Sequence, residues 1–443
     1  MLTAARFLVI CWHLLLQGGR FLLGRASLTL VRGLDPAQHA GRVARLKGRC
    51  LAALLRNLQA TFIKIGQILS TRRDLLSPPI IVELETLQDR VPGLPFATIR
   101  RVIEQDLGRE LESVFASFDR DAIAAGSIAQ VHEARLPDGT RVAVKVQRPG
   151  IGRIIDRDIA LLGLVARLAA WVPSVRQLQL PALVRELGRA IRAQLDFSRE
   201  IANSRRFAAN FADVDHVKVP PIFDAACGER VITMGLVVGC KLTDLPADGS
   251  LDRRLIAQRL IGMYHRMLLG DHFLHADLHP ANILIDGDGA LNLIDTGLVY
   301  EIPEHYVEKF IRVGSGLMMR NARLVVEGYL QGVDLPAAQR EQAVAQVEAM
   351  LGRHFGGGLS KLQIGEVLAE LLGLLGRNGI HLDSEWSGII LADLTFVGIA
   401  KTLDSEIDVL QATVRALPAY VARCSFVRDG DPLLSALSLG AAA

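Results

Sequence analysis

The sequence is poor in aromatic residues and cysteines and carries almost no net charge. Aromatic residues make up 5% of the 443 positions although half are hydrophobic, so we expect a core rich in Leu, Ala and Val that is mostly helical. The five cysteines include no Cys-x-x-Cys pair, which argues for a reducing compartment and against a structural zinc site. A net charge of +3 gives no support for nucleic-acid binding.

Long apolar runs are also lacking, since none reaches the roughly 18 residues that a membrane-spanning helix needs. The run 7–16 is short, is interrupted by His13 and is followed by Gln17. The first 50 residues carry eight Lys or Arg against one Asp, a balance of +7 that leaves −4 for the remainder. A basic and apolar N-terminus predicts an interfacial helix on an anionic membrane surface; a docking helix and a signal peptide are the alternatives.

The stretch from 275 to 297 carries the most specific pattern in the chain. It contains His-x-Asp-x-x-x-x-Asn, with Asp277 and Asn282, and then Asp-x-Gly, which begins at Asp295. Two short apolar runs joined by Asp-Gly-Asp-Gly lie between these parts and predict a tight hairpin. Phosphoryl transfer from ATP uses an Asp that faces the acceptor, and an Asn and a second Asp that bind Mg²⁺. A solvated turn with scattered acids is the alternative.

Several histidines near this motif raise the alternative of a histidine-ligated metal. His275 and His279 are four residues apart, but Pro280 and the loop context exclude the helix that would align them. We therefore expect His275 to orient the loop through hydrogen bonds.

An upstream segment predicts the phosphate-binding half of a kinase. Residues 123–132 lead through a Pro-Asp-Gly turn into the alternating strand 141–146, which contains Val-Ala-Val-Lys. If Val131 is aligned with the end of the kinase pattern Gly-x-Gly-x-x-Gly-x-Val, small residues still occupy the glycine positions. Lys145 then stands where a kinase lysine holds the α- and β-phosphates, with an edge-strand charge as the alternative. The predicted nucleotide-binding residues are Ala124, Ala125, Gly126, Ser127, Ile128, Ala129, Val131, Lys145 and Met234.

Helical spacing of apolar residues covers most of the rest of the chain. The helix expected over 181–210 carries Glu200, the candidate acid that pairs with the strand lysine, and Asp196 one turn earlier on the same face. One long helix is expected over 42–71, where Gly66 costs about 1 kcal/mol relative to Ala and suggests close approach by another element. From these residues alone, an exposed lysine beside a tolerated glycine is the simpler interpretation. Further helices are expected at 80–87, 97–107, 153–171, 251–269, 307–319, 337–350 and 364–375, and strands at 219–223 and 230–236.

These motifs together resemble the ABC1/UbiB (ADCK/AarF) family of atypical protein-kinase-like proteins over roughly residues 45–420. The segments that carry the resemblance are Lys-x-Gly-Gln at 64–67, 87–92, the Ala-rich loop at 124–132, 142–149, 195–200, 275–282 and Lys-Thr-Leu-Asp at 401–404. The resemblance implies a two-lobed α+β protein-kinase-like fold, with an N-terminal helical extension packed over the active-site cleft. By position it implies a lysine–glutamate pair, a catalytic-loop acid and two Mg²⁺ ligands, which are Lys145 with Glu200, Asp277, and Asn282 with Asp295.

The resemblance also implies a function, that of an Mg²⁺- and ATP-dependent atypical kinase or ATPase supporting isoprenoid-quinone (ubiquinone) biosynthesis. The protein would be cytoplasmic and peripherally associated with the inner membrane. Its partners would be an anionic membrane surface and isoprenoid-quinone precursors or their biosynthetic enzymes, with a homodimer left open and no nucleic acid. The Lys-x-Gly-Gln helix would block a protein substrate and the Ala-rich loop would suppress protein phosphorylation. The regulatory residues would be Lys64, Gly66, Gln67 and Asp196. A catalytically silent nucleotide-binding scaffold and a small-molecule phosphotransferase resembling the aminoglycoside kinases are the alternatives.

Three positions depart from the family's patterns. Gln194 replaces the first acid of Glu-x-Asp and cannot pair ionically with Lys64. Thr296 replaces the Phe of Asp-Phe-Gly, so an apolar packing residue is lost although the metal ligand is kept. Gly235 stands at a hinge position where an acid is common. The C-terminal transmembrane pair of many bacterial relatives is also missing, so anchoring is expected to fall to the basic N-terminus or to partners.

The expected domain order has five segments. Four of them follow from the motifs and the charge distribution, and the last is a small, apolar tail that we expect to be disordered. They are a membrane-associating segment 1–40, a helical extension 41–117, a kinase-like N-lobe 118–237, a helical C-lobe 238–427 and the tail 428–443.

Overall fold

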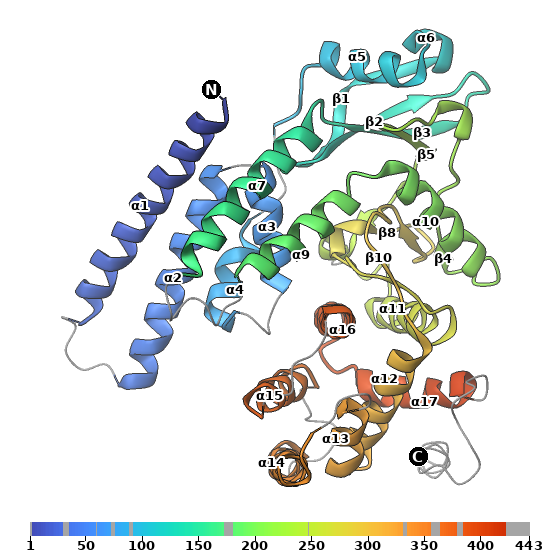
Figure 1. Ribbon diagram of the computed structural model, residues 1–443. Coiled ribbons are helices and arrows are strands. Elements are labelled where there is room, and N and C mark those ends of the chain that lie inside the picture. Colours follow the sequence, from blue (N-terminus) through green and yellow to red (C-terminus); the bar gives the residue numbers. More distant parts are fainter. Residues whose placement is uncertain are drawn as a thin grey trace. The chain divides into compact units, whose positions relative to one another are not determined.

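The computed structural model describes residues 2–29, 35–58, 60–71, 76–87, 92–171, 180–246, 248–330, 335–355, 364–378 and 384–421. The chain divides into two compact units (Figure 1). The N-terminal unit comprises Met1–Arg206 and Pro220–Leu236, and the C-terminal unit comprises Phe207–Val219 and Val237–Ala443. Each unit combines helices with small sheets and has a core of its own, which confirms the expected α+β class. The predicted tail lies outside the described residues.

The N-terminal unit contains a four-stranded antiparallel sheet in the order β1-β2-β3-β5. Its strands are β1 Ser117–Ala125, β2 Ala129–Arg135, β3 Arg141–Gln147 and β5 Val231–Gly235. The strands predicted over 141–146 and 230–236 are confirmed. The strand predicted over 219–223 is wrong, because Pro220 and Pro221 have no N–H for a ladder and only Ile222 forms a bridge, to Met234.

Helices cover both faces of this sheet because the side chains of β3 alternate between them. The valines of β3 pack against α5 (Phe96–Leu107) and α6 (Leu111–Val114). Ala143 lies in a separate cluster with Phe197 and Ile201 of α10 (Phe197–Asn210). This second face is the one that carries the candidate lysine, and the helix predicted at 97–107 is confirmed as α5.

A layer of helices extends the N-terminal unit beyond the sheet, and Figure 1 shows them side by side. They are α1 Leu2–Thr29, α2 Pro36–Leu58, α3 Ala60–Thr71, α4 Pro78–Glu85, α7 Ile151–Ala169 and α9 Leu180–Ala193. One apolar core joins all six, with contributions from Ile10, Phe62, Leu84, Ile155 and Ile191. The N-terminal extension is therefore packed on α7 and α9, the helices inserted after β3.

Two predicted helices each correspond to two described helices. The helix expected over 42–71 is described as α2 and α3, and residue 59 between them lies outside the described residues. The helix expected over 181–210 is α9 followed by α10, and Asp196 caps the second by accepting the N–H of Arg199 at 3.0 Å. Asp196 therefore stands one turn before Glu200, whose N–H donates to its carbonyl at 3.1 Å, but as the cap of α10 and not within one continuous helix.

Helix α1 corrects a further expectation. Ala5–Thr29 is long and apolar enough to cross a membrane by length and composition, with a mean hydropathy of 1.5 over its best window, 11% of which is buried. The sequence prediction missed this because it counted only an uninterrupted apolar run, which His13 and Gln17 break. Neither residue adds a formal charge, and the mean hydropathy over a longer window meets the criterion. A core helix and a signal sequence meet the same criterion, so length alone does not identify a membrane span.

The C-terminal unit contains two small sheets. The larger has the order β4-β9-β8-β6, and the smaller pairs β10 with β7. The strands are β4 Val217–Lys218, β6 Cys240–Lys241, β7 Phe273–His275, β8 Ile283–Ile285, β9 Leu291–Leu293 and β10 Val299–Glu301. The antiparallel register of β8 and β9, with Ile283 opposite Leu293, confirms the predicted hairpin.

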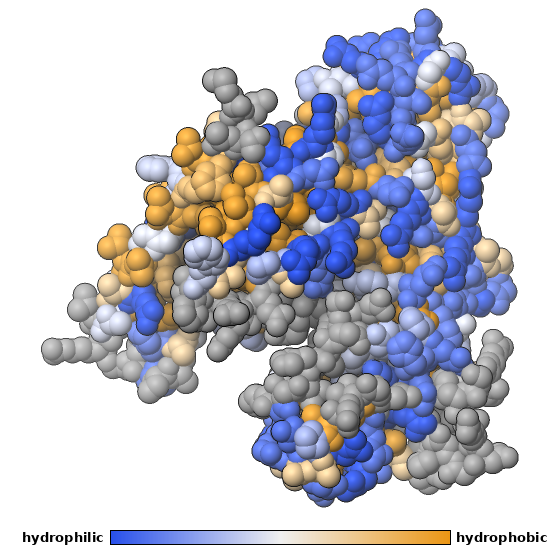
Figure 2. Space-filling model, in the orientation of Figure 1, coloured by the Kyte–Doolittle hydropathy of each residue, from blue (hydrophilic) through white to orange (hydrophobic). Residues whose placement is uncertain are grey.

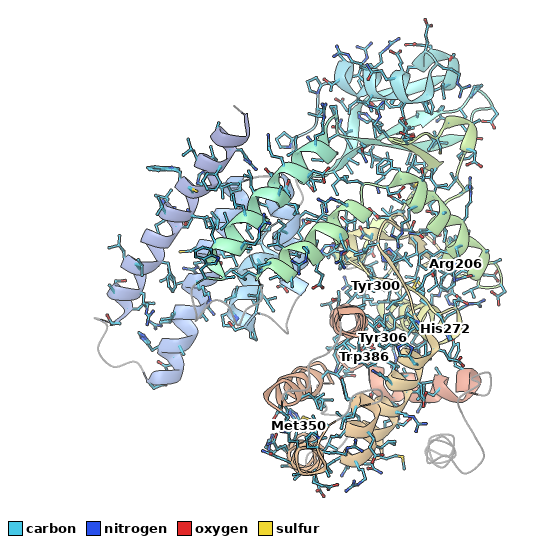
Figure 3. The ribbon with its side chains drawn as sticks, in the orientation of Figure 1. Arg206, His272, Tyr300, Tyr306, Met350 and Trp386 are labelled. Carbon is cyan, nitrogen blue, oxygen red and sulfur yellow. The ribbon has the colours of Figure 1, made fainter. Side chains whose placement is uncertain are left out.

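Helices make up most of the remaining described residues of the C-terminal unit. They are α11 Arg253–His265, α12 Glu304–Met318, α13 Ala322–Leu330, α14 Ala337–Phe355, α15 Ile364–Arg377, α16 Ser384–Leu403 and α17 Val409–Val421. Helix α11 ends earlier than predicted, because Arg266–Gly270 continues it as a single π-helical turn. The rings of Tyr306 and Trp386 stack at 5.6 Å and tie α12 to α16 in the core (Figure 3).

Candidate active site

The N-terminal unit holds the predicted lysine and glutamate in direct contact. Lys145 Nζ lies 2.6 Å from Glu200 Oε1, and the two side chains are 13% and 3% exposed. The ring of the buried Phe197 lies 5.5 Å from the same ammonium and shields it on one side. Glu200 stands in the first turn of α10, where the helix dipole favours a negative charge. The pair is a charge-assisted hydrogen bond largely removed from solvent.

The Ala-rich loop is a tight turn between β1 and β2. The N–H of Gly126 donates to the carbonyl of Ala129 at 2.9 Å. Arg148 then binds the turn from outside, donating from Nε to the carbonyl of Gly126 at 2.8 Å and from Nη2 to the carbonyl of Pro92 at 2.9 Å. Sequence reasoning missed this role of Arg148; the available signal was a charged residue between β3 and a Pro-Gly turn. The loop is thereby tied to the linker that precedes α5.

An apolar cluster of mostly buried residues lies next to this loop and includes several predicted nucleotide-binding residues. Ala129 and Met234 belong to one buried cluster with Ala143 and Phe197, and Ile128 and Val131 pack against it. Ala143, which sequence reasoning had not assigned to the site, faces Met234 across β3 and β5. Small apolar side chains of this kind suit the face of an aromatic base.

The Lys-x-Gly-Gln segment on α3 makes two kinds of contact. Gly66 is confirmed as a point of close approach, since a Cβ there would lie 2.2 Å from Leu87 Cδ1. Gln67 Nε2 donates to the carbonyl of Leu87 at 3.2 Å, so both residues hold α3 to the end of α4. Lys64 instead lines a hollow that also involves Ser127 of the Ala-rich loop and is too narrow to hold a water molecule. The regulatory roles of these residues stay predictions.

The C-terminal unit places His275 between the two predicted loops. This residue is fully buried, and its Nδ1 accepts the N–H of Asp277 at 3.2 Å while its Nε2 lies 2.5 Å from the carbonyl of Asp295. Because Nδ1 accepts and Nε2 must donate, the geometry assigns the neutral imidazole with its proton on Nε2. The predicted orienting role of His275 is confirmed.

The predicted metal ligands are held by neighbouring main-chain groups. Asn282 Nδ2 donates to the carbonyl of Asp277 at 2.8 Å, which leaves the amide oxygen as the atom for a cation. One oxygen of Asp295 accepts the N–H of Gly297 at 3.1 Å. A carboxylate and an amide oxygen are hard ligands that fit Mg²⁺, which binds few protein ligands and takes the rest from phosphate and water. No cluster of three or more His, Cys, Asp or Glu with metal-binding geometry occurs among the described residues.

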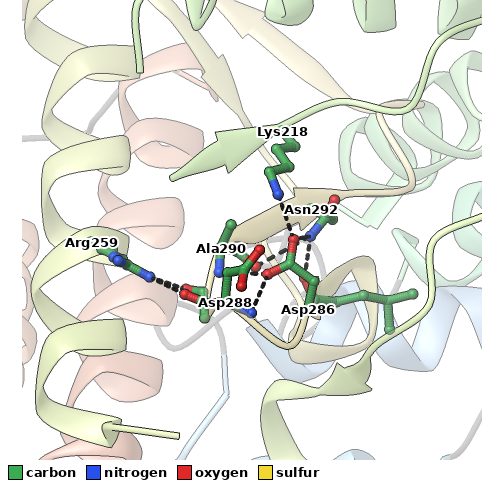
Figure 4. A network of polar contacts seen from close by, with 8 residues as sticks. Lys218, Arg259, Asp286, Asp288, Ala290 and Asn292 are labelled. Carbon is green, nitrogen blue, oxygen red and sulfur yellow. Dashed lines mark hydrogen bonds and ion pairs between the residues drawn. The ribbon is translucent and has the colours of Figure 1, made fainter. Parts of the chain in front are cut away.

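The hairpin between these two loops is fixed by Asp286 (Figure 4). Burial raises the pKa of this carboxyl group, but hydrogen bonds outweigh that effect and the net pKa is lowered. The donors are the N–H groups of Asp288 and Ala290, Nδ2 of Asn292 and Nζ of Lys218. All of these contacts lie within one unit, so they hold the hairpin that separates Asp277 from Asp295 in the chain.

Comparison with known proteins places this geometry in a family. The ABC1 atypical kinase-like domain matches residues 86–329. The chain belongs to this family. A relative from Tolumonas auensis named probable protein kinase UbiB is 32% identical over 402 residues, which cover 88% of this chain and 72% of the relative. One of the same name from Pseudomonas aeruginosa is 32% identical over 370 residues, 82% of this chain and 69% of that protein.

A solved structure supports the same fold at lower sequence identity. The complex of Rv3197 with erythromycin from Mycobacterium tuberculosis matches with a TM-score of 0.56 at 21% identity, and it covers 87% of this chain and 99% of that one. This likeness concerns the fold. The family match makes this domain kinase-like, as the motifs predicted.

Proposed function

We propose that this member of the ABC1 family is an Mg²⁺-dependent ATPase or atypical kinase that supports isoprenoid-quinone (ubiquinone) biosynthesis at a membrane. The observation that carries the proposal is the contact between Lys145 and Glu200 at 2.6 Å, the pairing that positions a kinase lysine for phosphate. The loop that holds Asp277 and Asn282 supports it, as does the name probable protein kinase UbiB that its relatives carry.

In this proposal each residue performs one physical task. Glu200 holds the Lys145 ammonium in place, so that it meets phosphate oxygens without further ordering. Asp277 accepts a hydrogen bond from the attacking hydroxyl or water and so orients its oxygen. Asn282 and Asp295 would hold Mg²⁺, which when bound neutralises charge on the phosphate oxygens.

The surface of α1 supports a membrane location. Leu8, Trp12, Leu15 and Leu22 recur at helical spacing along it and are each at least 64% exposed. Figure 2 shows hydrophobic residues gathered over this helix. By helical periodicity the exposed Arg20 and Arg25 flank the stripe on opposite sides, and residues 2–29 contain no acid. While it is docked, such a helix lies in the interface of an anionic bilayer with its arginines at the headgroups.

The catalytic part is tested by ATP hydrolysis with purified wild type and Asp277→Asn, each with anionic vesicles, with zwitterionic vesicles and without lipid. We expect turnover that anionic lipid stimulates and that the variant loses. Mg-ATP binding without turnover under every condition would overturn the enzyme and leave the scaffold. If the protein is a soluble phosphotransferase, removal of residues 1–75 would instead raise transfer to a soluble acceptor.

The membrane part is tested by vesicle co-sedimentation. Neutralising Arg20, Arg25 and Arg32 should weaken binding to anionic vesicles, and the difference from wild type should shrink as salt is raised. Arg32 lies outside the described residues and is included because it continues the basic segment. Binding that ignores both the charges and the salt would show that apolar insertion alone holds the protein.

A further inference from the structure

Helix α1 is docked on the N-terminal unit along most of its length. Its inner face includes the fully buried Ile10 and the buried Gln17. Further along, a Cβ at Gly24 would lie 2.7 Å from Leu46 Cδ2, so α1 and α2 are in close contact there as well. The outer apolar stripe can meet lipid while the inner face stays packed.

One residue joins the start of α1 to three other helices. Arg6 donates to both carboxylate oxygens of Asp158 on α7, from Nε at 3.0 Å and from Nη2 at 2.9 Å. Nη2 also donates to the carbonyl of Leu58 at the end of α2, and the guanidinium lies 5.5 Å from the ring of Phe62 on α3. The side chain of Asp158 is 0% exposed, so removal of Arg6 leaves a buried carboxylate with a weaker neighbour, Arg157, at 3.6 Å.

The same face of α7 leads from this ion pair to the Ala-rich loop. Ile155 and Ile151 precede Asp158 by three and seven residues, so the three side chains lie in one row. Both isoleucines line the narrow hollow together with Lys64 of α3 and Ile128 of the Ala-rich loop. A continuous seam between α3 and α7 therefore runs from Arg6 to the loop that we assign to nucleotide binding.

One buried hydroxyl group in this seam makes no hydrogen bond within the described part of the chain. Thr61 of α3 lies in it at 2% exposure, and its hydroxyl has no hydrogen-bond partner among the described residues. A buried hydroxyl without a partner favours opening, because water or lipid headgroups can then bind it. The closed seam is held by apolar packing and by the pair between Arg6 and Asp158.

We propose that the pair of Arg6 and Asp158 is a latch through which an anionic lipid surface at α1 controls the Ala-rich loop. The inference rests on the membrane part of the proposed function. Lipid favours the undocked helix because Ala5–Thr29 is apolar enough to bury both of its faces in a bilayer, whereas the docked helix offers lipid only one. Undocking withdraws Arg6 from Asp158, and the seam between α3 and α7 opens at the loop.

The test is amide hydrogen exchange of the full-length protein, followed over residues 60–71 and 124–131, with and without phosphatidylglycerol vesicles. For wild type we expect vesicles to raise exchange in both segments several-fold. Arg6→Ala should show that higher exchange without vesicles, and vesicles should add little. Arg25→Ala is the matched control: it removes a charge from the same helix, and exchange without vesicles should equal that of wild type.

Two further measurements keep the outcomes distinct. Arg6→Lys keeps the charge but cannot bind both carboxylate oxygens, so its amide exchange in the two segments should lie between that of wild type and that of Arg6→Ala. If Arg6→Ala also raises exchange in α5, which would indicate general unfolding, the result for Arg6→Lys decides whether the latch exists. Co-sedimentation is run on the same samples. If wild type binds vesicles but amide exchange in both segments does not change, the latch is overturned and the proposed function still stands. If wild type does not bind vesicles, both the latch and the membrane location are overturned. Exchange does not depend on ATP turnover, so an inactive enzyme leaves this test intact.

Discussion

Gly66→Ala separates a structural role of the Lys-x-Gly-Gln glycine from a regulatory one. A Cβ at this position would lie 2.2 Å from Leu87 Cδ1 and 2.9 Å from Leu55 Cδ1. Both leucines are 4% exposed and belong to the core of the extension, so they can yield only by disturbing their neighbours. Overpacking of this kind costs about 1–3 kcal/mol. Alanine regains about 1 kcal/mol of helix propensity, and because both contacts are far below van der Waals distance we expect a net loss of roughly 1–2 kcal/mol.

Gly163→Ala is the matched control for this substitution. Gly163 also lies inside a helix of the N-terminal unit, α7, but no heavy atom lies within 4 Å of the Cβ that Ala would add. The same change should therefore stabilise the protein by up to about 1 kcal/mol.

Thermal unfolding followed by circular dichroism distinguishes the two variants. For a domain of roughly 200 residues, 1 kcal/mol shifts Tm by about 2–4 °C, so Tm should fall by several degrees for Gly66→Ala and rise by a few for Gly163→Ala. An equal rise in both variants would refute the packing argument. The glycine would then have to serve an approach by something other than Leu55 and Leu87.

Four further predictions test the site and the C-terminal core. Asp295→Asn should abolish the Mg²⁺ dependence of nucleotide binding, and unchanged affinity of a fluorescent ATP analogue with Mg²⁺ would contradict the metal assignment. Glu200→Gln should reduce ATP turnover at least about tenfold with a smaller effect on nucleotide affinity, because Lys145 loses the charge that positions it. Asp196→Ala should reduce stability by about 0.5–2 kcal/mol, whereas Asp196→Asn should not, because Asn also caps a helix; equal losses in urea unfolding would favour an ionic role. Burial raises the pKa of Asp393 to about 7 from 3.8, and the nearby Tyr264 hydroxyl lowers it in part. The folded protein then holds a proton that the unfolded chain has lost, so stability should fall as pH rises from about 4 to 7, and Asp393→Asn should flatten that slope.

The parts of the site that the sequence predicts well are those fixed by short-range order. The hairpin of β8 and β9 follows from two apolar runs around Asp-Gly-Asp-Gly, and its length sets the spacing of Asp277 and Asp295. Likewise the turn between β2 and β3 sets the register that places Val131 opposite Lys145. In both cases the partners are close in the chain, so spacing determines geometry.

Contacts between distant segments could not be predicted in this way. Arg6 and Asp158 are 152 residues apart, and periodicity shows which face of each helix is apolar but not which charged residue on another helix lies opposite. Arg148 was missed because its acceptors are two backbone carbonyls, which leave no trace in side-chain pattern.

Several hydrogen bonds of the candidate residues do not use the positions at which the chain departs from the family's motifs. His275 and Asn282 are bound through main-chain groups of Asp277 and Asp295, and these contacts do not use the side chain of residue 296. Thr296 is 1% exposed and fills a place inside the C-terminal unit. Lys145 likewise meets Glu200 without the side chain at position 194. The contact of Lys145 with Glu200 and these contacts of His275 and Asn282 are therefore present although the usual Phe and Glu are replaced.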